Sequence, residues 1–333
     1  MKKLHKSSFL KFYNVKISFN NNVVSDNKKG LLYGLIGVIF VGLQPIIAIS
    51  NPPAVNAYIS AAMTCLVETT IFFPLMIVEL IRNKKNNINQ NFSNNSILKG
   101  WRNNLWLLIF IGFIFGINQI FFFVGYKMAG PVNGSLTQKT TVFFAMLLGY
   151  LILKEKITKL QIFFSIILFF GLMIGITQGF SLIEFSLTIL FGVIILLAIS
   201  FLWMVGHTLT KPILDRKEAT PIQMVFIRNF LSGTFLIITY FIFFPIDFSI
   251  FFDLDNAVFF LSMGTVYGSG LVCWYKTLSY LEVSKASTIF APTPVLSAIF
   301  TIIFLDESLR IYNLIGIILV ILSIIVIINQ KRE

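Results

Sequence analysis

The sequence predicts an all-α integral membrane protein in which ten transmembrane helices form two inverted five-helix repeats. Its composition, ten long apolar runs and an internal duplication carry this prediction. Hydrophobic residues make up 56% of the chain and charged residues 12%, with a mean hydropathy of +0.85. A typical soluble domain has roughly 25% charged residues. We therefore expect most of the chain to lie in lipid.

The apolar runs have the length of membrane helices. A bilayer core takes about 20 apolar residues of helix, and each run is about twice as long as a barrel strand. No run alternates polar and apolar residues, so helices are favoured over an outer-membrane barrel. The runs cover residues 30–50, 57–81, 105–126, 132–153, 159–178, 187–209, 222–244, 257–280, 284–305 and 311–328.

Residues 112–155 and 264–307 are similar in sequence at a constant spacing of 152 residues, which indicates an internal duplication. The matched pairs are Gly112 with Gly264, Gly116 with Gly268, Ser135 with Ser287, Thr141 with Thr293, Leu153 with Leu305 and Glu155 with Glu307. Two related halves that rock about a shared central site are typical of transporters. We expect repeats over 30–178 and 187–328, between a basic tail at 1–29 and a short C-terminus at 329–333.

Lysine and arginine predict the orientation. With a cytoplasmic N-terminus, 21 of these residues fall in inside segments, and only Lys127 and Arg310 fall outside. Such a bias over short loops follows the positive-inside rule. We therefore expect a multi-pass protein of the plasma (inner) membrane with both termini in the cytoplasm. Because five helices per repeat is an odd number, the second repeat enters the membrane from the opposite side.

The two copies also carry a family likeness. The stretches from Ala129 to Lys156 and from Leu281 to Ser308 each close a fourth helix on a Leu-x-Glu turn. This pattern resembles the drug/metabolite transporter superfamily and its EamA-type domains, over roughly residues 30–330. The resemblance implies a secondary transporter or exporter of small metabolites, such as an amino acid, an organic anion or a drug-like compound. It also implies that no cofactor is bound.

Other function classes find less support in the sequence. There is no Gly-Lys-Ser/Thr phosphate loop, no His-Glu-x-x-His and no Cys-x-x-Cys. We therefore predict no enzyme activity and no metal site. The net charge of +12 lies mainly in inside loops, where it faces anionic lipid rather than nucleic acid. The predicted partners are a small-molecule substrate, the lipid bilayer and a coupling ion, in a monomer or homodimer. A lipid scramblase or a non-transporting receptor on the same scaffold is the alternative.

Four charged residues inside the apolar runs are the main site candidates. A charge at the bilayer centre costs about 2.5 to 3.5 kcal/mol on insertion scales, so such residues usually mark a function. Glu68 lies in the middle of its run and Lys139 near the middle of its own. Arg228 and Lys276 lie nearer the inner ends, where snorkelling to the interface is a rival explanation. Three cations with one central anion favour an anionic substrate, whereas pairing of Glu68 with Lys139 or Arg228 would leave the interior nearly neutral.

The duplication helps to rank the remaining candidates. Lys139 corresponds to Ala291 and Lys276 to Val124, so both lysines break the repeat, as residues for substrate chemistry would. Glu155 and Glu307 obey the repeat and are expected to cap the turns at helix ends, while its glycines are expected to serve close helix packing. Pro45 is expected to break its helix, as are Pro292 and Pro294 together, and each break either lines a cavity or is only a packing kink. The last candidates are Gln44 beside Pro45 and the flat side chains of Trp203, Trp274 and Tyr275. His207, near the inner end of its run, is expected to be a satisfied helix-end histidine, with titration during transport as the alternative.

Overall fold

The computed structural model describes residues 4–88, 96–176, 186–244, 248–306 and 309–329. These residues form a bundle of α-helices and contain no strand. The helices are α1 (Leu4–Ile49), α2 (Ala57–Ile88), α3 (Ser96–Asn103), α4 (Leu105–Ala129), α5 (Pro131–Gln138), α6 (Thr140–Leu153), α7 (Lys159–Ile176), α8 (Leu187–Asp215), α9 (Pro221–Phe243), α10 (Ser249–Phe252), α11 (Leu254–Tyr280), α12 (Val283–Ile289), α13 (Thr293–Leu305) and α14 (Ile311–Asn329).

Each of the ten predicted runs is helical over most of its described residues, which confirms the fold class. Nine spans in the described ranges have the length and hydropathy to cross a membrane, and the apolar part of α14 is shorter, at Ile311–Ser323. Two of the spans are helix pairs, α5 with α6 and α12 with α13. The short helices α3 and α10 lie outside the predicted runs.

The helix contacts indicate an approximate two-fold relation between the halves of the bundle. Helix α1 packs on α11 as α4 packs on α8, and α1 packs on α13 as α6 packs on α8. Helices α2 and α9 pack on each other, as do α7 and α14. Each of these pairs joins the first repeat to the second. The interior therefore lies between the two repeats rather than inside either of them.

The repeated glycines permit this close packing, as predicted. A Cβ on Gly112 of α4 would lie 2.6 Å from the Leu231 side chain of α9, and a Cβ on Gly264 of α11 would lie 2.5 Å from Val67 of α2. The Ser232 hydroxyl also donates to the Gly112 carbonyl at 2.6 Å. Because equivalent glycines face α9 in one half and α2 in the other, they belong to the shared scaffold.

The fourth helix of each repeat is interrupted near its centre. Helix α5 ends at Gln138 and α6 begins at Thr140, so Lys139 alone forms the first break. The second break spans three residues, between Ile289 and Thr293, where two prolines follow each other closely. The first break is therefore shorter, and the first half has Val142 where the second half has Pro294. Both α6 and α13 then end on a residue in the left-handed conformation, Lys154 at φ 57° and Asp306 at φ 52°, at the same spacing of 152.

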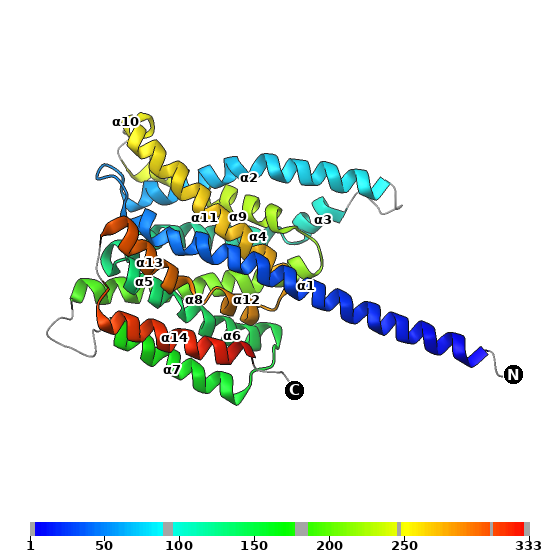
Figure 1. Ribbon diagram of the computed structural model, residues 1–333. Helices are drawn as coiled ribbons and strands as arrows, with labels where there is room; N and C mark the ends of the chain where they lie inside the picture. The colour runs from blue at the N-terminus through cyan, green and yellow to red at the C-terminus, as the bar shows by residue number, and fades with distance from the viewer. Residues whose placement is uncertain (1–3, 89–95, 177–185, 245–247, 307–308, 330–333) are drawn as a thin grey trace.

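Helix α1 differs from the prediction in two ways. It begins at Leu4, so the predicted tail continues the membrane helix, and it projects from the bundle (Figure 1). At 1.5 Å per residue its 46 residues would span about 69 Å, more than twice a bilayer core. The expected break at Pro45 is wrong, because the helix continues to Ile49. Proline there removes only the hydrogen bond to the Val41 carbonyl, four residues earlier.

Candidate functional site

A cavity of about 90 Å³ lies between the two repeats. Both halves supply its walls: α1, α4, α5 and α6 from the first repeat, and α8, α9, α11 and the break after α12 from the second. Two pairs of wall residues are related by the spacing of 152, Phe115 with Tyr267 and Gln138 with Phe290. The cavity therefore lies on the approximate symmetry axis, which is where a rocking-bundle transporter holds its substrate.

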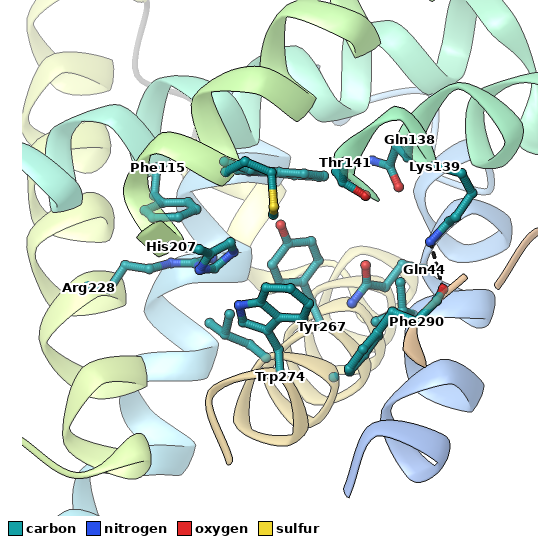
Figure 2. A pocket seen from close by; sticks show the side chains of 15 residues that line it. Gln44, Phe115, Gln138, Lys139, Thr141, His207, Arg228, Tyr267, Trp274 and Phe290 are labelled. Carbon is teal, nitrogen blue, oxygen red and sulfur yellow. Dashed lines mark hydrogen bonds between the residues drawn. The ribbon is translucent and has the colours of Figure 1, made fainter. Parts of the chain in front are cut away.

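Lys139 connects the two helix breaks. Its ammonium donates to the Phe290 carbonyl at 3.0 Å (Figure 2). That carbonyl lies four residues before Pro294, so the proline leaves it without its usual helical donor. The lysine, only 4% exposed, satisfies the freed acceptor across the repeat interface. An ammonium has three donors and this bond uses one, so the others can serve a ligand in the cavity.

Arg228 approaches the cavity from α9. It is 3% exposed, so it does not snorkel to the surface. Its guanidinium lies over the Phe115 ring, 3.9 Å from the ring centroid, in a cation–π contact. Figure 2 shows Arg228 and Lys139 on opposite sides of the cavity. No aspartate or glutamate is among the described residues that line it. The two cations therefore give the cavity a positive charge.

Unpaired nitrogen atoms add to the positive character of the cavity. Within the described part of the protein, several buried nitrogen atoms of the cavity wall have no hydrogen-bond partner. They are Gln138 Nε2, Trp203 Nε1, His207 Nδ1, Arg228 Nε and Trp274 Nε1. Buried polar atoms are rarely left unsatisfied, and each such group calls for a partner. Four of these five are donors and His207 Nδ1 is either donor or acceptor, so a ligand rich in acceptor oxygens would suit them.

Aromatic rings form the rest of the wall. The His207 ring lies 5.1 Å from Phe115 and 4.9 Å from Trp274, measured between centroids. Trp274 in turn packs edge-on against Phe290 at 5.2 Å. The prediction that His207 ends its helix is wrong, because α8 continues two turns further to Asp215. Its imidazole therefore lies in the cavity wall, where it faces any ligand.

The chain resembles known proteins in sequence. Its sequence matches the EamA-like transporter family twice, over residues 28–177 and 190–329. The chain belongs to the EamA-like transporter family. It is 28% identical over 213 residues to an uncharacterized transporter, YyaM, of Bacillus subtilis (strain 168), which covers 64% of this chain and 68% of YyaM. An uncharacterized transporter of Methanothermobacter thermautotrophicus is 23% identical over 293 residues, 84% of this chain and 81% of that protein.

A solved crystal structure has the same fold as this EamA-family protein. The TM-score is 0.66 at 13% sequence identity, over 90% of this chain and 96% of the other. The family match confirms the resemblance stated from the sequence, and it makes this chain a multi-pass membrane protein of a transporter family. Both halves of the bundle are EamA repeats.

The predicted site residues separate into two groups in this EamA-family protein. Five line the cavity: Gln44, Lys139, Trp203, Arg228 and Trp274. Three do not: Glu68, Tyr275 and Lys276. Tyr275 is fully buried behind His207, with ring centroids 5.5 Å apart. Lys276 is only partly buried and lies 4.6 Å from the centroid of the Tyr33 ring, towards the end of α11, so its placement fits the snorkelling explanation.

Glu68 pairs with neither of the cations proposed for it. Its carboxylate accepts a hydrogen bond of 2.6 Å from Asn229 Nδ2 of α9, and the side chain is completely buried. Lys139 is occupied at Phe290 instead. Among the described residues, no ion pair within 4.0 Å joins Glu68 to Lys139 or Arg228. Glu68 therefore forms no direct ion pair with either cation, although Arg228 acts on it electrostatically.

Glu155 has the capping role expected from the repeat. Its two carboxylate oxygens accept from the Val283 amide at 3.2 Å and from the Ser284 hydroxyl at 2.6 Å. These donors open α12, so a residue of the first repeat caps a broken helix of the second. Glu307, its repeat partner, lies outside the described residues. The Glu155 contact joins the ends of the two broken helices on one side of the cavity.

Sequence reasoning missed several wall residues, among them Phe115, Gln138 and Tyr267. Phenylalanine and tyrosine are too common in this chain to stand out. The usable signal was the duplication itself, because Phe115 and Tyr267 occupy equivalent positions and the centre of such a fold lies on its symmetry axis.

Proposed function

We propose that this protein carries small organic anions across the membrane by alternating access. The observation that supports this most is the wall of the central cavity. Among its described residues are two cations and a set of unpaired nitrogen atoms, and no carboxylate. Charged donors hold carboxylates and phosphates with short, strong hydrogen bonds. Arg228 supplies a planar fork for two oxygens, and Lys139 a point charge on the far side.

The size of the cavity favours a small substrate. Sites for drug-sized ligands measure roughly 300 to 1,000 Å³, and this cavity holds about 90 Å³. Aromatic walls suit a substrate with a flat or apolar part beside its charged group. An organic anion of metabolite size therefore fits better than a bulky drug.

Transport in this proposal needs neither ATP nor a second chain, since one chain holds both repeats and has no nucleotide-binding motif. The excess of lysine and arginine on one side supports a plasma membrane location with both termini in the cytoplasm. The cavity would open alternately to each side as the repeats rock.

Uptake into proteoliposomes tests the proposal. Purified protein is reconstituted and offered radiolabelled gluconate, succinate, glycerol 3-phosphate and phenylpyruvate, with choline and lysine as cationic comparisons. We expect at least one anion to enter faster than into empty liposomes, and neither cation to do so.

Entry of the cations without the anions would contradict the proposal. Movement of fluorescent lipids between leaflets without any solute uptake would support the scramblase alternative instead. Protein that binds an anion but never transports it would support a receptor.

A further inference from the structure

Glu68 is the only fully buried acidic residue in the described part of the chain, and it does not line the cavity. It lies at the centre of α2 with a relative exposure of 0%. Oxygen Oε2 accepts from Asn229, while Oε1 has no hydrogen-bond partner among the described residues. A single hydrogen bond is poor compensation for an ionised carboxylate in a low-dielectric interior. The charge of Glu68 therefore depends on its neighbours.

Three helices pack against α2: α4, α9 and α11. Asn229 of α9 donates to the Glu68 carboxyl, and Gly268 of α11 lies beside the Glu68 side chain. Helix α9 contributes Arg228. The other ionisable groups that act on Glu68 are Tyr267 and Tyr275 of α11 and Cys65 of α2 itself. Phenol and thiol groups carry no charge near pH 7. The ionisable residues of α4, Tyr126 and Lys127, lie at its far end. Arg228 is thus the only cation among these groups that can balance an ionised Glu68.

Arg228 also lines the cavity, and the next residue on α9, Asn229, donates to Glu68, so the positive charge of Arg228 acts on both the cavity and the carboxyl. While the cavity is empty, the arginine can balance an ionised Glu68. An anion that binds in the cavity competes for the same positive charge, and the carboxylate is then less well compensated. Taking up a proton removes that conflict.

We propose that Glu68 is the proton-binding site that couples anion transport to proton movement through Arg228. This inference rests on the proposed function. A proton from water on one side binds the Glu68 carboxylate when the anion binds, and it leaves to water on the other side when the anion is released. By linkage, bound anion raises the affinity for the proton and bound proton raises the affinity for the anion by the same factor. The coupling is therefore symport.

The charge balance makes the mechanism measurable. One monoanion that moves with one proton carries no net charge, so a pH gradient drives its transport and a membrane potential does not. For a monoanion that moves with one proton, a gradient of about one pH unit, acid outside, should give about tenfold accumulation. A carrier without the proton site would only equilibrate the anion.

The experiment compares wild type, Glu68→Gln and Glu79→Gln. Glutamine keeps the shape of glutamate and can accept from Asn229, but it cannot exchange a proton. Glu79 lies on the same helix, accepts from the Thr220 hydroxyl and does not line the cavity, so it is the matched control. Each protein is given the four anions named above with and without the pH gradient, and proton uptake on anion addition is followed with a pH dye in weakly buffered detergent.

We expect wild type and Glu79→Gln to accumulate a transported anion against its gradient and to take up a proton on binding it. Glu68→Gln should still exchange labelled for unlabelled anion but should neither accumulate it nor take up a proton. Anion transport by wild type that ignores the pH gradient would overturn the coupling and leave the proposed function intact. Accumulation by Glu68→Gln at the wild-type level would also overturn it. Failure of all four anions in wild type, in contrast, would contradict the proposed function itself.

Should Glu68→Gln fail to fold, Glu68→Asp supplies a second readout. It retains a carboxyl but moves it away from Asn229 and Arg228. We expect proton-coupled accumulation to persist with a shifted pH profile. A pH profile identical to wild type would count against Glu68 as the proton site.

Discussion

Replacement of Lys139 by methionine separates its role in binding from its role in stability. The substitution keeps most of the side-chain volume and removes the ammonium, with its 3.0 Å bond to the Phe290 carbonyl. A hydrogen bond to a charged group contributes about 1.5 to 3 kcal/mol. Burying an ammonium in the bilayer costs about 2.5 to 3.5 kcal/mol on insertion scales. In Lys139→Met, the lost hydrogen bond and the avoided cost of burying a charge therefore nearly cancel in the free energy of unfolding.

The Phe290 carbonyl would also retain other hydrogen bonds in Lys139→Met. Phe290 O also accepts from the Thr293 amide at 3.3 Å and from its hydroxyl at 2.5 Å. We therefore expect Lys139→Met to unfold within a few degrees of wild type in detergent. No such cancellation applies to binding of the substrate. The lost contact between the ammonium and the anion contributes about 1.5 to 3 kcal/mol, which corresponds to roughly 10- to 150-fold weaker binding.

The assay combines thermal unfolding with anion uptake in vesicles. Lys139→Arg retains the charge and should keep part of the activity, since its fork still reaches an anion but fits the helix break less well. Wild-type uptake by Lys139→Met would refute the binding role. A loss of several kcal/mol of stability would refute the cancellation argued above and would indicate a structural lysine.

Three further predictions concern the scaffold and the orientation. Gly264→Ala should destabilise the protein by about 1 to 3 kcal/mol through overpacking, because its Cβ would lie 2.5 Å from Val67. The Cβ of Gly116→Ala would meet nothing closer than 3.5 Å, so this control variant should be tolerated. Equal shifts of the unfolding temperature for the two variants would contradict the packing argument. Glu155→Ala removes both acceptors at the start of α12, a contact that we expect to hold the cytoplasmic side of the bundle closed. A cysteine introduced nearby should therefore be labelled faster from the cytoplasm. Unchanged labelling would mean that the contact does not hold the cytoplasmic side closed. A cysteine at Lys217 should react with impermeant reagents only from the cytoplasm and one at Asp253 only from outside, and the reverse pattern would invert the proposed topology.

The fold followed from the sequence because its causes are local and repeated. Apolar length gives a membrane helix wherever it occurs, and the spacing of 152 reveals the two halves without any knowledge of contacts. The break near Pro294 was also predictable, because proline removes a backbone donor whatever surrounds it. Pro45 shows the limit of that rule, since a proline within a turn of a helix end disturbs little.

The site was only partly predictable because it depends on which helix faces meet. Lys139 and Arg228 stood out as charges in apolar runs, a costly arrangement that marks an interior position. Glu68 stood out for the same reason, yet it lies behind the cavity rather than in its wall, and nothing in its own run distinguishes the two places. His207 was misjudged because α8 extends beyond its apolar run, through a polar stretch to Asp215.

The most direct test of the central claim is an experimental structure of the protein with a transported anion bound. We predict that the carboxylate or phosphate oxygens lie in the cavity between the repeats, within about 3.2 Å of nitrogen atoms of both Arg228 and Lys139. An anion bound elsewhere, for example beside Lys276, with Arg228 and Lys139 in contact only with protein, would contradict the account.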